Sequence, residues 1–131
     1  MAKDKKKKKE DPKRIYIFDS RDGENAASEL YKANRDLEVC IFPNQNNPER
    51  FPDRLPGGYN LYLLHVDDVL PEVIQNLRDR TTSIMLGRSG ASFNINDIPE
   101  DIRTLFDKMY ANGSWYADVS DRRNEILRFL D

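Results

Sequence analysis

The sequence predicts an α/β fold in which a sheet of five mostly parallel strands lies between two layers of helices, a three-layer doubly wound architecture. Three observations lead to this prediction. Strand-like and helix-like segments alternate after residue 13. One of them, residues 59–66, is an almost continuous apolar run, which is typical of a strand buried on both faces. The length of 131 residues suits one domain with one core.

The first half of the domain contains two predicted strands, one helix and one irregular segment. Residues 14–18 are a β-branched and aromatic run that ends at Asp19 and a polar turn. Apolar residues recur at helical spacing over residues 26–33, and residues 37–42 form the second predicted strand. Residues 43–58 carry four of the seven prolines, so we expect a loop there with at most one helical turn.

The second half continues the alternation. Residues 59–66 are the third predicted strand, and the following helix begins near Pro71, because the first helical turn tolerates proline. Residues 82–86 predict the fourth strand. A helix after Pro99 is favoured by apolar residues at helical spacing, which are Ile102, Leu105, Phe106, Met109 and Tyr110. We expect a short fifth strand at residues 115–117 and a closing helix that contains Ile126, Leu127 and Leu130.

Positive charge is concentrated at the start of the chain. Residues 1–14 hold eight Lys or Arg against three Asp or Glu, about +5, which leaves about −7 for the rest because the whole chain carries −2. Such a segment cannot bury an apolar core, so we expect residues 1–13 to be a disordered tail before a single domain at 14–131. Residues 3–14 suit contact with nucleic acid or an anionic surface, although a solubilising tail needs no partner. The acidic body argues against a DNA-binding domain.

The sequence gives no sign of a membrane span or of an oxidising compartment. No segment approaches the roughly twenty apolar residues of a membrane helix, and no apolar stretch follows the basic start as in a secretory signal. Cys40 is the only cysteine and lies in a strand-like stretch, so we expect a buried small hydrophobe and no disulfide within the chain. A cytoplasmic setting is the default expectation. One histidine and one cysteine exclude the common zinc sites.

The order, spacing and size of these elements resemble the receiver domain of bacterial response regulators over residues 14–131. The resemblance implies a flavodoxin-like sheet with strand order 2-1-3-4-5. In that family an aspartate at the end of the third strand accepts phosphate, and a proline lies four residues beyond it. Asp67 stands four residues before Pro71 and is therefore the phosphoacceptor candidate. Because acidic residues after the first strand bind magnesium in the family, the resemblance implies a Mg²⁺ site at Asp19, Asp22 and Asp67.

Departures from the family pattern indicate a degenerate receiver, or pseudo-receiver. Ser20 stands where the second acidic residue is expected, although Asp22 or Glu24 can substitute from the turn. Gly87 replaces the family's Thr or Ser, with Ser89 as the nearest hydroxyl. No lysine follows Lys108, so the family's lysine after the fifth strand is absent. A carboxylate accepts phosphate poorly without cations that screen the incoming charge, and we therefore do not expect phosphorylation by the usual mechanism.

Several of these residues also have simpler interpretations. Asp67 and Asp68 suit the start of the helix near Pro71 as capping residues. The small-residue loop 87–92 suits anion binding through backbone N–H groups or a plain strand-to-helix connection, and its anion-binding candidates are Arg88, Ser89 and Gly90. His65 shares a strand face with Asp67, and a buried, hydrogen-bonded histidine is favoured over a catalytic or metal-binding one.

Two functions follow as hypotheses. The first is a non-catalytic regulatory domain that binds a protein partner through its exposed helix faces or the 43–58 loop, since irregular loops of this length are usually functional. The second is a Mg²⁺-dependent phosphoaccepting receiver, or a small nucleotide-binding enzyme similar to the TIR family, that uses the crevice at the carboxyl ends of the strands. No catalytic residue and no cofactor other than Mg²⁺ is predicted.

Overall fold

The computed structural model describes residues 12–19, 23–42, 54–66, 69–89, 98–110 and 115–130. Its strands are β2 (Arg14–Phe18), β3 (Glu38–Phe42), β4 (Leu61–His65), β5 (Ile84–Arg88) and β6 (Lys108–Tyr110). Its helices are α1 (Gly23–Ala33), α2 (Pro71–Arg80), α3 (Glu100–Arg103) and α4 (Trp115–Arg128). The predicted tail, apart from residues 12 and 13, and most of the predicted 43–58 loop lie outside the described residues.

The five strands form one sheet in the order β3-β2-β4-β5-β6, and every neighbouring pair is parallel. Counted along the chain, this is the order 2-1-3-4-5, so the predicted fold is confirmed. Because the strands are parallel, their last residues lie at the same end of the sheet, which we call the carboxyl end. Helices that connect parallel strands run back toward the opposite, amino end.

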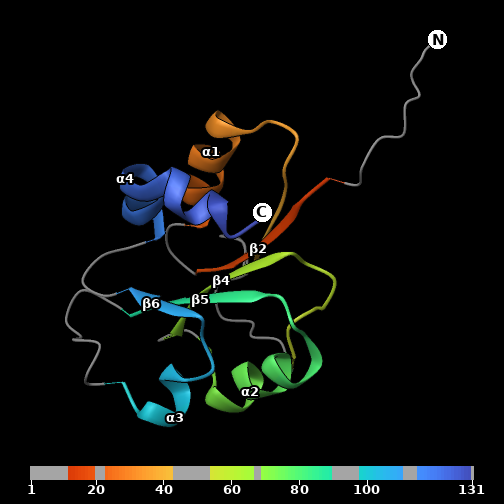
Figure 1. Cartoon of the computed structure of the whole chain (residues 1–131), viewed down its shortest axis with the longest axis vertical. Coiled ribbons are helices and arrows are strands. Elements are labelled where there is room, and N and C mark those ends of the chain that lie inside the picture. The colour runs from red at the N-terminus through yellow and green to blue at the C-terminus, as the bar shows by residue number, and fades with distance from the viewer. Residues whose placement is uncertain are drawn as a thin grey trace.

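Helices α1 and α4 cover one face of the sheet, and α2 and α3 cover the other (Figure 1). Strand β4 lies in the middle and contributes to both cores. Leu61 and Leu63 pack on the side of α1 and α4, whereas Tyr62 and Leu64 pack on the side of α2, and all four side chains are fully buried. Successive residues of a strand point to opposite faces, so an apolar run is what a strand buried on both faces requires.

Helix α2 forms as the sequence predicts. Pro71 occupies its first turn, and Val73, Ile74 and Leu77 form the buried stripe. Arg78 donates hydrogen bonds of 2.9 Å to the carbonyl oxygens of Thr81 and Ser83, which ties the end of the helix to the start of β5. No helix within the described part of the chain has the length and apolar character needed to cross a membrane.

The segment after Pro99 folds differently from the prediction. Helix α3 has only four residues, the fifth strand is β6, and residues 115–117 begin α4 instead of forming a strand. The side chain and backbone of Asp107 explain the difference. Its Oδ2 accepts a hydrogen bond from the Met85 N–H at 2.8 Å, and its own N–H donates to the Met85 carbonyl at 2.8 Å. These bonds fasten the segment to β5 and end the helix early.

Cys40 is exposed, so the prediction of a buried cysteine is wrong. Strand β3 lies at the edge of the sheet and has a neighbouring strand on one side only, which leaves its side chains less covered than those of β4. The hydroxyl of Tyr31 accepts a hydrogen bond from the Val39 N–H at 3.1 Å. This contact satisfies one backbone donor of the edge strand.

Candidate functional site

Four side chains with polar groups lie in a row across the carboxyl end of the sheet. Asp19 follows β2, His65 ends β4, Arg88 ends β5 and Tyr110 ends β6. The strand register places Arg88 beside both His65 and Tyr110. The alternation along β4 and β5 turns His65 and Arg88 toward the face that α1 and α4 cover. The site is therefore built where the predicted doubly wound fold places ligand sites.

Arg88 is the centre of this row. Its side chain is 1% exposed, and its Nη2 forms an ion pair with Oδ2 of Asp118 in α4. Its Nη1 donates a long hydrogen bond of 3.4 Å to the Ser89 carbonyl. The guanidinium carbon lies 5.8 Å from the ring centroid of Tyr110 and 5.7 Å from that of Trp115. Strand β5 runs two residues further than predicted, so Arg88 belongs to the strand and not to a loop.

Arg88 is a buried cation that lies near two buried carboxylates. Burial and, to a smaller extent, the charge of Arg122 lower the pKa of the Arg88 guanidinium to about 10, whereas the negative charge of Asp19 opposes this shift. Arg88 therefore stays positive at neutral pH, between the carboxylates of Asp19 and Asp118, which are 3% and 9% exposed. Buried carboxylates are costly unless an opposite charge accompanies them. The guanidinium serves as their counter-charge.

The same cluster contains buried polar atoms that make no hydrogen bond within the described residues. Within the described residues, Ser89 Oγ, Trp115 Nε1 and Arg88 Nε are buried and make no hydrogen bond. Buried polar groups in proteins are nearly always hydrogen-bonded to protein or water. All three atoms can donate, so the cluster has the chemistry to hold a water molecule or another small acceptor.

Tyr110 connects β6 to α4 beside this cluster. Its hydroxyl donates a 2.9 Å hydrogen bond to Oε2 of Glu125, and Lys108 reaches the same oxygen at 2.7 Å. Burial, together with Glu125, raises the pKa of Tyr110 to about 12. Helix α4 departs from helical geometry at Arg122, whose guanidinium carbon lies 5.8 Å from the Tyr110 ring centroid. Strand β6 and α4 are thus joined by one polar network.

Gly87 has no room for a side chain. A Cβ atom built on it lies 2.5 Å from Sδ of Met109 and 3.0 Å from Cδ1 of Phe106. Both distances are shorter than ordinary van der Waals contact, so the segment from Phe106 to Met109 packs directly on the glycine backbone. This position is where the resemblance to receivers places a Thr or Ser. In this chain the volume of that side chain is filled by Met109 of β6 and by Phe106, which precedes β6.

The structure describes only part of the predicted site. Asp19 lies in the row, and Arg88 and Ser89 are fully buried beside it. Asp22, Asp67, Asp68 and Gly90 lie outside the described residues, as does Ser20. Within the ranges that the structure describes, no three His, Cys, Asp or Glu side chains gather closely enough to hold a metal ion.

Sequence reasoning missed the partners that α4 brings to the site. Trp115 and Asp118 are three residues apart on this helix, and Val119 follows at the fourth position, so all three face the core. That spacing was a detectable helical signal. The adjacent aromatic residues Trp115 and Tyr116 favoured a strand instead, and no local pattern links Asp118 to Arg88, thirty positions earlier.

Several solved structures similar to this chain are receiver domains or response regulators. A response regulator from Thermotoga maritima has a TM-score of 0.60 and 12% identity, over 89% of this chain and 98% of its own. The receiver domain of the TMAO respiratory system response regulator TorR has a TM-score of 0.59 and 17% identity, over 92% of this chain and 100% of its own.

A chain from the complex of the CheA3 P1 domain with CheY6 from R. sphaeroides has a TM-score of 0.54 and 17% identity. The match covers 92% of this chain and 98% of that one. At these identities the similarity shows that the chain has the receiver fold. No protein-family model matches the sequence, and the comparison with curated proteins gives no match.

Proposed function

We propose that this domain is a degenerate receiver that regulates by binding another protein and does not accept phosphate. The observation that carries the proposal is the buried ion pair between Arg88 and Asp118. Phosphoryl transfer to a carboxylate depends on cations that neutralise the charge developing on the phosphoryl oxygens. Arg88, the buried cation at the carboxyl end, is already paired with a carboxylate of the protein itself. Releasing it would leave Asp118 buried and unpaired, which is costly.

Two further features support this proposal. The packing of Met109 and Phe106 on Gly87 leaves no space for the hydroxyl side chain that the resemblance to receivers calls for. One of the similar chains comes from a complex of the CheA3 P1 domain with CheY6, so a chain with this fold takes part in a protein complex there. Protein binding requires no phosphate chemistry at the carboxyl end.

A phosphoaccepting receiver is the second candidate. Asp19 favours it, because this carboxylate is buried in the row and lies close enough to Arg88 to influence its pKa. If Arg88 exchanged Asp118 for an incoming phosphoryl group, it would supply the missing positive charge. Asp67 would then be the acceptor.

Incubating the full chain with acetyl phosphate and Mg²⁺ separates the two candidates. We expect no phosphoryl adduct in the intact mass and no movement of the Asp19 and Gly87 amide signals, because the positive charge of Arg88 is already paired with Asp118. The control is Asp68→Ala, which removes the same charge as Asp67→Ala at the neighbouring position. A phosphoryl adduct that Asp67→Ala abolishes and Asp68→Ala preserves would refute the proposal.

A further inference from the structure

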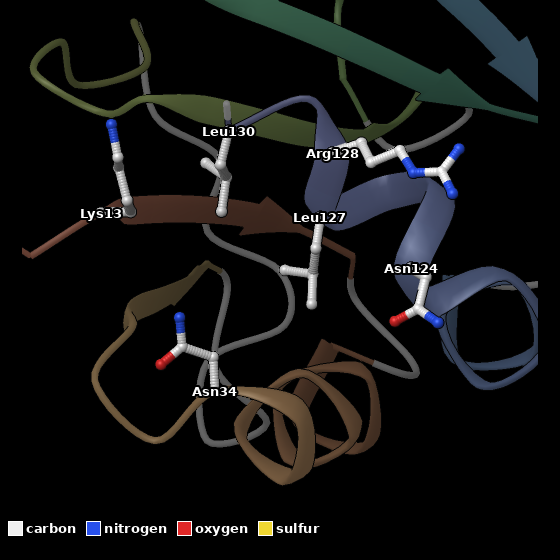
Figure 2. Close-up of a pocket in the computed structure, with 6 residues that line it drawn as sticks. All are labelled: Lys13, Asn34, Asn124, Leu127, Arg128 and Leu130. Atoms are coloured by element: carbon white, nitrogen blue, oxygen red, sulfur yellow. The ribbon is translucent and has the colours of Figure 1, made fainter.

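A groove of about 420 Å³ opens at the amino end of the sheet, on the opposite side of the domain from the Arg88 cluster. It is formed where α1 and α4 end and β2 begins (Figure 2). Its lining residues are Lys13, Asn34, Asn124, Leu127, Arg128 and Leu130. The volume lies near the lower end of the range for ligand sites, about 300–1,000 Å³, so the groove accommodates a short segment.

We propose that this groove binds a short acidic segment of a partner protein, with carboxylate side chains next to an apolar residue. The inference rests on the proposed function, protein binding, and assigns it a surface. The groove is independent of the carboxyl end, because no lining residue belongs to the row of Asp19, His65, Arg88 and Tyr110.

The charged groups of the groove are both cations. Lys13 and Arg128 are exposed, and within the described residues neither side chain forms an ion pair or a hydrogen bond. Nearby cations on the same two helices are already paired. Lys32 and Arg123 both contact Glu29, at 2.8 and 3.2 Å. Lys13 and Arg128 are thus available for carboxylates of a partner.

The floor of the groove is apolar. Leu127 and Leu130 are half-buried and pack against the core beneath α1 and α4. In the view of Figure 2 their side chains lie between Lys13 on one side and Asn124 and Arg128 on the other. An apolar side chain placed between two carboxylates therefore meets leucine in the middle and positive charge at the sides.

The polar groups favour a peptide over an inorganic anion. A carboxamide both donates and accepts hydrogen bonds, as a peptide backbone does. Asn34 Oδ1 already accepts the Asp36 N–H at 2.9 Å, which holds its carboxamide in place and leaves its NH₂ group available. Asn124 also lines the groove, and its carboxamide oxygen can accept a hydrogen bond from a peptide N–H, whereas an inorganic phosphate has few donors to offer it.

The chain itself offers a poorer occupant. Residues 3–9 contain six lysines and one aspartate, so Lys13 and Arg128 would repel them. Charge complementarity therefore points to an acidic segment from another protein.

The test is a titration of the ¹⁵N-labelled full chain with the peptide acetyl-Glu-Asp-Leu-Leu-Asp-Glu-amide, followed by amide shifts. We expect saturable movement at Asn34, Asn124, Leu127 and Leu130, weakening with added salt, and no movement at Gly87. The double variant Lys13→Glu, Arg128→Glu should weaken binding by about tenfold or more, because two ion pairs become repulsive. The control is Arg54→Glu, which reverses an exposed cation outside the groove and should change the affinity less than twofold.

Four results would overturn the inference. In the first, the groove amide signals do not move when the peptide is added. In the second, a peptide with Gln and Asn in place of the acids moves them equally, and in the third, the double variant binds the acidic peptide with unchanged affinity. In the fourth, the groove signals move when the protein concentration alone is changed. The last would assign the groove to a second copy of the chain. None of these results produces a phosphoryl adduct, so failure of the groove is distinguishable from failure of the proposed function.

Discussion

Replacing Arg88 with methionine should lower the free energy of unfolding by about 3–5 kcal/mol. Methionine fills much of the volume of the arginine side chain, but it leaves Asp118 and Asp19 buried without their counter-charge. Leaving a buried charge unpaired lowers the free energy of unfolding by more than the intact ion pair contributes to it. Urea denaturation followed by the fluorescence of Trp115, the single tryptophan and a fully buried one, measures the change.

Two control variants test whether the loss of stability comes from the unpaired buried charge. The double variant Arg88→Met, Asp118→Leu should recover part of the lost stability, because it removes the unpaired Asp118 carboxylate, whereas Asp19 still lacks its counter-charge. Lys108→Met breaks the ion pair of Lys108 and Glu125, in which the two side chains are 42% and 39% exposed. It should lower the free energy of unfolding by about 0–1 kcal/mol. If Arg88→Met costs no more than Lys108→Met, the guanidinium is not the counter-charge of the site.

Replacing Gly87 with threonine should cost about 1–3 kcal/mol. Threonine is the residue type that the resemblance to receivers places here, so the exchange restores the family pattern in sequence. The structure predicts damage, because the new Cβ meets Sδ of Met109 and the ring of Phe106. These side chains must move away from β5 to admit it. The same urea denaturation measures the loss.

Gly57→Thr is the matched control for this exchange. A Cβ at Gly57 meets only Nη1 of Arg80, at 3.7 Å, an ordinary contact. We expect Gly57→Thr to change stability by less than about 0.5 kcal/mol, as for surface substitutions away from special features. Equal effects of the two substitutions would mean that Met109 and Phe106 do not occupy the space beside Gly87.

The parts of the fold that the sequence predicts well are those with one consistent local pattern. The run over β4 is apolar at every position that both cores need, and α2 combines Pro71 at its start with a buried stripe. The error after Pro99 arose because Phe106, Met109 and Tyr110 have helical spacing. Only the bonds between Asp107 and Met85, which join distant segments, reveal the strand.

The candidate site was likewise predictable only where a local sequence pattern marks it. Asp19 follows from the end of a strand-like run, and the structure places it in the row at the carboxyl end. The sequence does not reveal the counter-charge, because Arg88 follows Gly87 and the small-residue stretch 87–92 predicts a loop. Its burial depends on Asp118, Trp115 and Tyr110, which the fold brings together from α4 and β6. Contacts between distant segments leave no periodic signal in the sequence.

The most direct test of the central claim, that Arg88 supplies internally the positive charge of this site, is a magnesium titration followed by the amide signals of Asp19 and Gly87. Wild type and the variant Arg88→Met, Asp118→Leu should be compared under the same conditions. We predict no movement in the wild type at millimolar Mg²⁺ and saturable movement in the variant, because removing the guanidinium leaves the buried Asp19 carboxylate without a counter-charge and therefore attractive to the metal ion. Magnesium binding by the wild type that is as tight as in the variant would contradict the claim.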